Sequence, residues 1–291
     1  MVRSDVKSDV DIIVDPGTEV REYIKKASEI FPFVSCEEQI RVGSNNIKKE
    51  HFKFTYFSPV RQEEFYILLD ILYEENYYAA LVEKEIRNEL LLTEGSNLTV
   101  RVPSVDSILG DKLTAFAPYT TGVPLREKKD LEVMKQFYDI GTLISEHKNF
   151  SHVLNTYKEV VASESSYRGL NLTPRDVLED TIAAAVVIGS RGKTGKNYYP
   201  VYVEGIRGVW THVFAERFSG EIASYRAADL IYMAACLMAE KPYEKIENFE
   251  EYADEQLSQD ELKVLAKMRK AQPLKYAYLV KADRLLKECR R

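Results

Sequence analysis

Two aspartates near the start of the chain have types and spacing that suit a metal site. Asp9 and Asp11 alternate with β-branched apolar residues, and a Pro-Gly pair follows shortly afterwards, which is the pattern of a short strand. Residues i and i+2 of a strand point to the same side. We therefore expect the two carboxylates to share one face, while Val10, Ile12 and Val14 face the core.

Two carboxylates held this close repel each other unless a cation lies between them, so the pair favours a divalent metal with oxygen ligands. Mg2+ suits such a site because it binds one or two carboxylates together with substrate phosphates. The alternative is a strand end at which Asp9 and Asp11 are both solvated, since a single DxD pair has low specificity as a motif.

A third acid interrupts an apolar strand further along. Asp70 lies within the run Phe65–Leu72, where a charge is costly to bury unless it is paired or bound to a metal. From a neighbouring strand it could complete a three-acid site for two metal ions about 4 Å apart, the arrangement used for in-line phosphoryl displacement. The alternative is an aspartate on an edge strand that faces water.

Charged residues on two expected helices are the remaining candidates for a functional site. Lys112 falls on the same helical side as Val105 and Ile108, where its ammonium group either reaches a triphosphate as a point charge or snorkels to solvent. Lys135 and Asp139 are spaced i and i+4 and therefore share one helical face. Taken alone, they are also compatible with an ordinary surface pair.

The elements that must position these residues change character along the chain. The first hundred residues predict one helix, over residues 18–30, among several strands. Strands are expected over residues 9–14, 52–57, 64–73, 77–84 and 98–102, the last two completing the sheet. One helix among several strands favours an α+β or mixed α/β fold.

From Pro103 onward the hydrophobic pattern becomes helical. Ser104 is a good N-cap for residues 105–116, and Thr173-Pro174 opens a helix that runs to Val187. Other helices are expected over residues 130–147 and 222–239, the latter as a buried spine, then from Ser258 and after Pro273. We place the domain boundary in the Pro/Gly loop, between a strand-rich domain of residues 1–117 and a helical domain of residues 118–291.

Composition narrows the function classes. The formal net charge of -6 is unlike that of a general nucleic-acid coat, which carries a net basic surface.

The segment Gly189–Thr194 is not a P-loop, because Val187 stands where the motif needs Gly and a helix precedes it. It is interpreted as a basic inter-helix loop, with a contribution to acceptor binding as the alternative.

Cysteine and histidine usage gives no support for a zinc site or a disulfide framework. The three cysteines are few and far apart, which indicates free thiols in a reducing compartment. The four histidines show no paired spacing of the kind that binds zinc. Charge at the N-terminus argues against a signal peptide, and the longest apolar run, Leu230–Ala239, is too short to cross a bilayer. We expect a soluble cytoplasmic protein with no membrane association.

The order and setting of these signals resemble the AbiEii/AbiGii-type nucleotidyltransferase toxin family. The resemblance spans about residues 8–145 and is most specific over Gly110–Pro118. The segments that carry it are Ser8-Asp9-Val10-Asp11, Leu69-Asp70-Ile71, Gly110-Asp111-Lys112-Leu113-Thr114-Ala115-Phe116 and Lys135-Gln136-Phe137-Tyr138-Asp139-Ile140. It implies an α+β fold with a mixed-sheet, polymerase-β-like nucleotidyltransferase part followed by an all-helical part.

The resemblance also implies an activity and partners. Family members act as toxins restrained by a separately encoded antitoxin, and some transfer nucleotides to tRNA. The expected cofactor is Mg2+, and the expected substrate is an NTP.

The family motifs can be transferred residue by residue. Asp9, Asp11 and Asp70 would hold the metal ions, and Asp70 would also activate the acceptor hydroxyl. Lys112 would contact the nucleotide phosphates. Lys135 and Asp139 would match the later Arg/Lys-Asp-x-x-Asp motif. Asp139 would then be a catalytic residue, and Ser8 and Lys135 would bind the nucleotide together with Lys112.

Two departures from the family pattern bear on activity. The family has a Gly-Ser or Gly-Gly turn upstream of the DxD, whose backbone N–H groups seat the triphosphate. Here eight residues precede Asp9 and none is Gly, so we expect either a domain truncated at its N-terminus by a late starting Met or a protein that lacks the nucleotide cradle. Gln136 stands where the later motif has its first Asp.

Three functions follow as alternatives. An active nucleotidyltransferase toxin is the first. A catalytically inactive nucleotidyltransferase-like protein that acts by binding protein or RNA is the second. A sugar-nucleotide transferase that uses the DxD for a metal diphosphate is the third, and neither Asp70 nor the Lys112 segment requires it.

Overall fold

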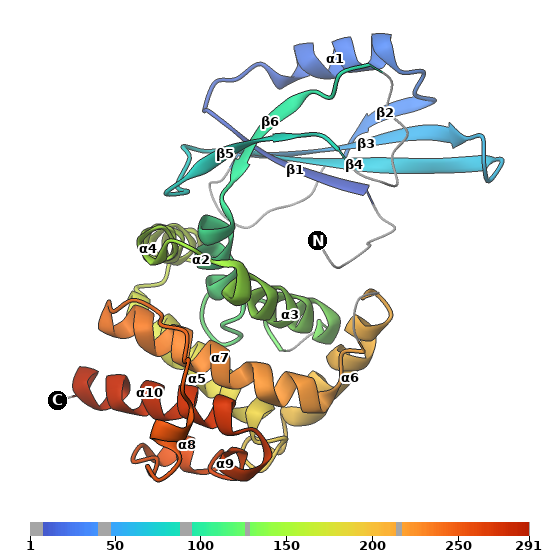
Figure 1. Cartoon of the computed structure of the whole chain (residues 1–291). Helices are drawn as coiled ribbons and strands as arrows, with labels where there is room; N and C mark the ends of the chain where they lie inside the picture. Colours follow the sequence, from blue (N-terminus) through green and yellow to red (C-terminus); the bar gives the residue numbers. More distant parts are fainter. Residues whose placement is uncertain (1–7, 40–47, 88–94, 126–128, 214–216, 291) are drawn as a thin grey trace. The chain divides into compact units, whose positions relative to one another are not determined.

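The computed structural model describes residues 8–39, 48–87, 95–125, 129–213 and 217–290. The chain forms two compact units, the first up to Tyr77 and the second from Tyr78 onward, and each is described by itself (Figure 1). We call them the sheet unit and the helical unit. The division into domains of residues 1–117 and 118–291 stays a prediction.

The sheet unit is a mixed four-stranded sheet with one helix. Its strand order is β1-β4-β3-β2, with β1 parallel to β4 and the other neighbours antiparallel. Its elements are β1 (Ser8–Val14), α1 (Val20–Ile30), β2 (Ser35–Glu38), β3 (Lys49–Ser58) and β4 (Glu63–Tyr73). The predicted helix and three predicted strands are therefore confirmed. The short strand β2, which has no apolar alternation, was missed.

One face of the sheet packs against α1 (Figure 1). The core there joins the buried Val20 of α1 to Phe52, Phe54, Ile71 and Tyr73, with further apolar residues of β1 and β4 packed around them. Burial of such side chains is worth roughly 1.5–3 kcal/mol each and is what holds the helix on the sheet.

The predicted inward positions of β1 are confirmed at two of three places. Ile12 and Val14 pack against the core, as alternation requires. Val10 is 46% exposed and does not join that core. The expectation that Val10 faces the core was therefore wrong. The reason is that β1 lies at an edge among the described strands of the sheet and has a neighbouring strand on one side alone.

The strands predicted over residues 77–84 and 98–102 do not complete the main sheet. They correspond to β5 (Leu81–Glu85) and β6 (Thr99–Pro103), which form their own two-stranded antiparallel ribbon. Most of their residues are exposed, so they offer no apolar face to the sheet core. The ribbon belongs to the helical unit, where the backbone N–H of Ser104 donates to the carbonyl of Ala80 at 2.9 Å.

The helical unit is built around one buried helix, α7 (Gly220–Ala239). The remaining elements are α2 (Val105–Ala115), α3 (Asp130–Glu146), α4 (Phe150–Tyr167), α5 (Pro174–Gly189), α6 (Tyr199–Trp210), η1 (Glu250–Tyr252), α8 (Asp260–Lys263), α9 (Met268–Ala271) and α10 (Pro273–Cys289). Figure 1 shows α5, α7 and α10 side by side, and apolar residues of all three belong to one core. The all-helical character predicted for residues 118–291 is confirmed over the described residues of that range.

The buried spine predicted over residues 222–239 is confirmed as α7. By length and composition this helix could cross a membrane, but 72% of the relevant window is buried inside the unit. Small residues such as Ala227, Ala228 and Ala234 are fully buried and let the neighbouring helices approach closely. Helix α7 is therefore the core helix of the unit.

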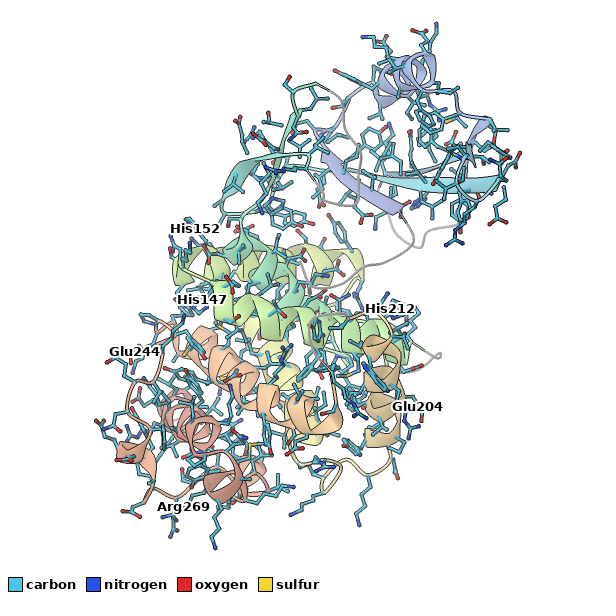
Figure 2. The ribbon with its side chains drawn as sticks, turned by 45° about the vertical axis from the view of Figure 1, so that its right-hand side comes forward. His147, His152, Glu204, His212, Glu244 and Arg269 are labelled. Atoms are coloured by element: carbon cyan, nitrogen blue, oxygen red, sulfur yellow. The ribbon has the colours of Figure 1, made fainter. Side chains whose placement is uncertain are left out.

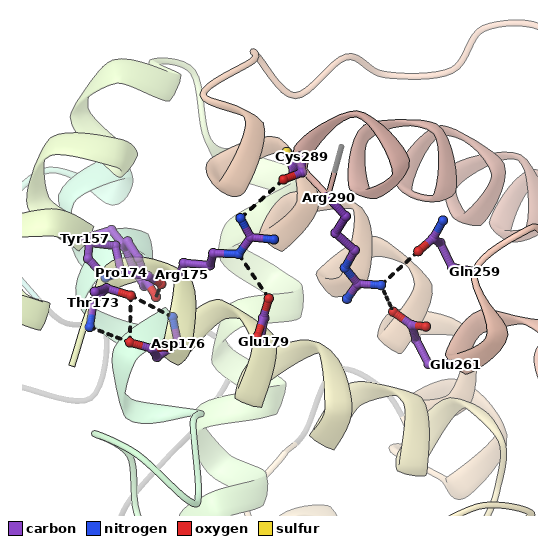
Figure 3. A network of polar contacts seen from close by, with 10 residues as sticks. All are labelled: Tyr157, Thr173, Pro174, Arg175, Asp176, Glu179, Gln259, Glu261, Cys289 and Arg290. Carbon is purple, nitrogen blue, oxygen red and sulfur yellow. Dashed lines mark hydrogen bonds and ion pairs between the residues drawn. The ribbon is translucent and has the colours of Figure 1, made fainter.

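Helix caps predicted from sequence are present. The Ser104 hydroxyl accepts the backbone N–H of Ser107 at 3.2 Å, which begins α2. Thr173 and Asp176 form a capping box at α5, where the Thr173 hydroxyl accepts the Asp176 N–H and the Asp176 carboxylate accepts the Thr173 N–H (Figure 3). Pro174 follows as the first helical residue, as expected.

The start of α5 is also tied to the end of α10 (Figure 3). The Arg175 guanidinium donates to the backbone oxygen of Cys289 at 3.2 Å and to the Glu179 carboxylate at 3.1 Å. Arg290 forms an ion pair with Glu261. These contacts are largely exposed, so they fix the ends of the helices more than they stabilise the unit.

A buried carboxylate anchors the loop that follows α2. Asp180 of α5 is 9% exposed, and its Oδ2 accepts the Tyr119 N–H and the Thr120 hydroxyl, both at 2.8 Å. Its Oδ1 is buried and has no hydrogen-bond partner in the part of the chain that the structure describes. Burial, the largest cause, raises the pKa of Asp180 above its ordinary value despite these hydrogen bonds.

Asp180→Ala is expected to destabilise the helical unit by about 1–3 kcal/mol, since two donors lose their acceptor. The pKa of Asp180 is higher in the folded than in the unfolded chain, so its stabilising contribution is complete below the unfolded pKa and is lost as pH rises through the folded pKa. The free energy lost in the variant should be larger at pH 5 than at pH 8. Guanidinium unfolding followed by the fluorescence of the single tryptophan, Trp210, measures it.

The matched control for this measurement is Asp176→Ala. Asp176 also belongs to α5 and also caps backbone donors, but its pKa is lowered, chiefly by the Thr173 hydroxyl. The pH dependence of its contribution therefore has the opposite sign. Equal pH profiles for the two variants would contradict the assignment of Asp180.

Candidate active site

Asp11, Asp70 and His51 form one row across three strands of the sheet unit. The register pairs Asp11 of β1 with Asp70 of β4, and Asp70 with His51 of β3. Residues paired in this way have their side chains on the same face of a sheet. The next residues along, Ile12 and Ile71, belong to the core beneath α1, so the row lies on the opposite face.

Asp70 is held by a histidine. The His51 Nδ1 lies 2.7 Å from the Asp70 Oδ1, and the two side chains are 16% and 33% exposed. In the tautomer that suits this contact, the His51 Nδ1 carries the proton and donates, because a carboxylate without a proton can only accept. The alternative in which Asp70 lies on an edge strand is wrong, since β4 lies between β1 and β3.

The first two residues of β1 are described by their backbone alone. Ser8 lies opposite Ile67 and Asp9 opposite Leu68, and their side chains fall outside the described residues. Asp11 is exposed. Among the described side chains no group of three potential ligands could hold a metal ion. The predicted three-acid site needs Asp9, and it stays a prediction.

Lys112, Gln136 and Asp139 meet between α2 and α3 of the helical unit. The Lys112 ammonium donates to the Gln136 side-chain oxygen at 2.9 Å and lies 3.4 Å from the Asp139 Oδ2. The Lys112 and Asp139 side chains are 28% and 17% exposed. Lys112 therefore has one acid and one neutral amide beside it, and it does not merely snorkel. Lys135, one turn before Asp139 on α3, is half-buried.

Helix α2 is held rigidly enough to present Lys112. A Cβ atom at Gly110 would lie 2.5 Å from the backbone oxygen of Val153, so only glycine allows α4 to pack this close. The Tyr78 hydroxyl donates to the Asp111 carboxylate at 3.0 Å. Burial raises the pKa of Asp111. With Leu113 fully buried, Gly110 and Asp111 fix the rotation of α2 about its axis.

Two residues at these positions were missed by sequence reasoning. His51 was considered only as a metal ligand, and Gln136 only as a departure from a motif. Strand alternation places His51 on the same face as Lys53, but nothing in the sequence gives the register that brings it to Asp70. The contact between Gln136 and Lys112 likewise depends on how α2 and α3 pack.

The basic segment after α5 is an inter-helix loop, as predicted. Arg191, Gly192 and Gly195 all have positive φ, at 55°, 76° and 63°, so the turn is tight. The nearby Lys267 has a lowered pKa, because of burial first and then repulsion by Lys193 and Arg191. Within the described parts of the chain these three cations have no ion pair, so positive charge gathers at this loop.

Comparison with known proteins assigns most of the chain to a family. The family described as Nucleotidyl transferase AbiEii toxin, Type IV TA system, matches residues 8–192, which is more than half of the chain. No curated protein matches the chain as a relative. The crystal structure of JHP933 from Helicobacter pylori is similar with 14% identity and a TM-score of 0.41, covering 81% of this chain and 76% of that one.

The matched segment contains the predicted catalytic, nucleotide-binding and metal-binding residues, from Ser8 to Asp139, and the match defines the class of protein as a nucleotidyltransferase. The chain belongs to the AbiEii nucleotidyl transferase toxin family of type IV toxin–antitoxin systems. The family resemblance drawn from the sequence is thereby confirmed. Membership implies an NTP as substrate and a relation to an antitoxin.

Proposed function

We propose that this toxin binds an NTP with Mg2+ and transfers a nucleotide from it to an acceptor hydroxyl. Asp9 and Asp11 hold the metal ions, together with Asp70, which also receives the acceptor proton. Lys112 binds the nucleotide phosphates, with Ser8 and Lys135 on the nucleotide side. Asp139 pairs with Lys112.

The observation that carries this proposal is the pairing of Asp11 with Asp70 across two hydrogen-bonded strands. Two carboxylates on neighbouring strands and the same face repel one another in the absence of a cation. Oxygen ligands of this kind suit Mg2+, and the ion supplies charge stabilisation for phosphoryl transfer when bound. The residues present therefore fit the expected metal.

An RNA acceptor, with tRNA as the candidate, is supported by the basic loop. Arg191, Lys193 and Lys267 concentrate positive charge in a chain whose net charge is -6. Cations without acidic partners are suited to phosphate groups of a nucleic-acid backbone. Beside the loop, Tyr198 is 46% exposed and stacks edge-on against Tyr119, and exposed aromatic rings of this kind can stack on unpaired bases.

The remaining partners follow from the family. We propose that a separately encoded antitoxin restrains the toxin and that both act in the cytoplasm.

The experiment that tests the proposed function is a calorimetric titration of each NTP, with and without Mg2+, into the protein and into Asp11→Ala. Binding by the unmodified chain is expected to need Mg2+, and the variant should bind at least about tenfold more weakly, since it lacks a metal ligand. The same samples, incubated with radiolabelled NTP and total RNA, should label RNA of tRNA size.

The outcomes separate the alternatives. Binding that is independent of Mg2+ and of Asp11 would contradict the proposed site. A folded protein that binds no NTP at all would favour the inactive, partner-binding alternative. Label on an acceptor other than RNA would leave the transferase assignment intact and remove the tRNA proposal.

A further inference from the structure

His51 differs in its partner from His147 and His152. Figure 2 labels the other three histidines on the helical unit. His147 lies 2.6 Å from the backbone oxygen of Ile144, and His152 lies 3.3 Å from an Asn149 amide. His51 instead contacts the carboxylate of Asp70, an acid of the proposed site.

The geometry of this contact constrains the carboxylate more than the histidine. The His51 ring comes from β3, is largely buried and donates through Nδ1 to one oxygen, Oδ1. A carboxylate with one oxygen held at 2.7 Å loses free rotation about its last side-chain bond. The direction of Oδ2 is then set by the sheet, because both residues lie on hydrogen-bonded strands in register.

We propose that His51 is the positioning residue for Asp70: by donating from Nδ1 it fixes the orientation in which Asp70 serves the proposed transfer reaction. This inference rests on the proposed function. His51 is not a metal ligand in this arrangement, since its Nδ1 proton is directed at Asp70. Its role is of the kind that outer residues have around a metal site, where they orient the ligands.

The experiment compares three variants in nucleotide transfer. His51→Ala should lower kcat about 10–100-fold, as the loss of an outer orienting residue does elsewhere, and leave KM for the NTP within about twofold. His51→Asn should recover much of kcat, because its amide nitrogen lies near the place of Nδ1. His51→Gln, whose amide reaches the place of Nε2, should not.

A role in folding alone would give a different pattern. It would lower the melting temperature and leave kcat per folded molecule unchanged, and it would not distinguish Asn from Gln. Equal kcat for His51→Ala and the unmodified protein would overturn the proposal. In the Asp70→Ala background, a further loss on changing His51 would also overturn it, since the two residues are proposed to act as one unit.

A readout independent of activity keeps the two proposals distinguishable. The ring nitrogens of His51, observed by 15N NMR, should show the proton on Nδ1, and Asp70→Ala should abolish that preference. A ring protonated on Nε2 alone would refute the positioning role whatever the enzyme does. Conversely, a correct tautomer in a chain that transfers no nucleotide would refute the proposed function and leave the contact itself established.

Discussion

Asp70→Asn is expected to reduce nucleotide transfer on the order of 10³-fold, the size of effect typical for loss of a general base. The amide is isosteric with the carboxylate and can still accept the His51 proton, so the sheet should fold normally. What it loses is the negative charge that would bind a metal ion and receive the acceptor proton. The measurement is incorporation of labelled nucleotide under single-turnover conditions, together with growth inhibition on expression.

The control for this change is Asp15→Asn. Asp15 follows directly after β1 and is exposed, so the same chemical change there should leave transfer and toxicity unaltered. If Asp70→Asn transfers nucleotide at a rate within about threefold of the unmodified protein, the loss of rate is far smaller than the contribution of a general base. That result would exclude Asp70 from the reaction. Full toxicity of that variant would exclude transfer as the cause of toxicity.

Lys112→Ala is expected to lower kcat/KM for the NTP by roughly 10–100-fold. Hydrogen bonds to charged groups are worth about 1.5–3 kcal/mol, which corresponds to that range. The loss should appear mainly as weaker nucleotide binding, because Lys112 is proposed to act on phosphates in the ground state and the transition state alike. Initial rates over a range of NTP concentrations measure both parameters.

A matched lysine gives the control for Lys112. Lys158 belongs to the same unit and pairs with Glu240 at 2.6 Å, but both side chains are exposed. Lys158→Ala should therefore change neither the activity nor, by more than about 1 kcal/mol, the stability. A KM for NTP unchanged in Lys112→Ala would be incompatible with a phosphate contact.

Much of the fold could be predicted because its signals are local. The alternation of Val10, Ile12 and Val14 predicts β1, and Ser104 and Thr173 mark where α2 and α5 begin. The wrong predictions concern features that depend on tertiary contacts. The segments that form β5 and β6 have strand signals, but a strand signal does not say which sheet the strand joins.

In the candidate site, the sequence singled out the acidic residues and the lysines but not the residues that contact them. Asp11 was singled out because it shares a strand face with Asp9, and Asp70 because a charge in an apolar strand needs a reason. The register pairs Asp11 with Asp70. His51 carried no such signal, since a histidine in a half-exposed strand is ordinary. Gln136 was interpreted through what it replaces, whereas the structure gives it a contact of its own with Lys112.

The parallel pairing of β1 with β4 has a consequence for synthesis of the protein. The hairpin β3–β4 is local in sequence and can bring His51 and Asp70 together by itself. Asp11 can join them only after the chain has been made through the end of β4, and closing this non-local contact is the slower step. A nascent chain on the ribosome would thus hold Asp70 paired with His51 before Asp11 joins them.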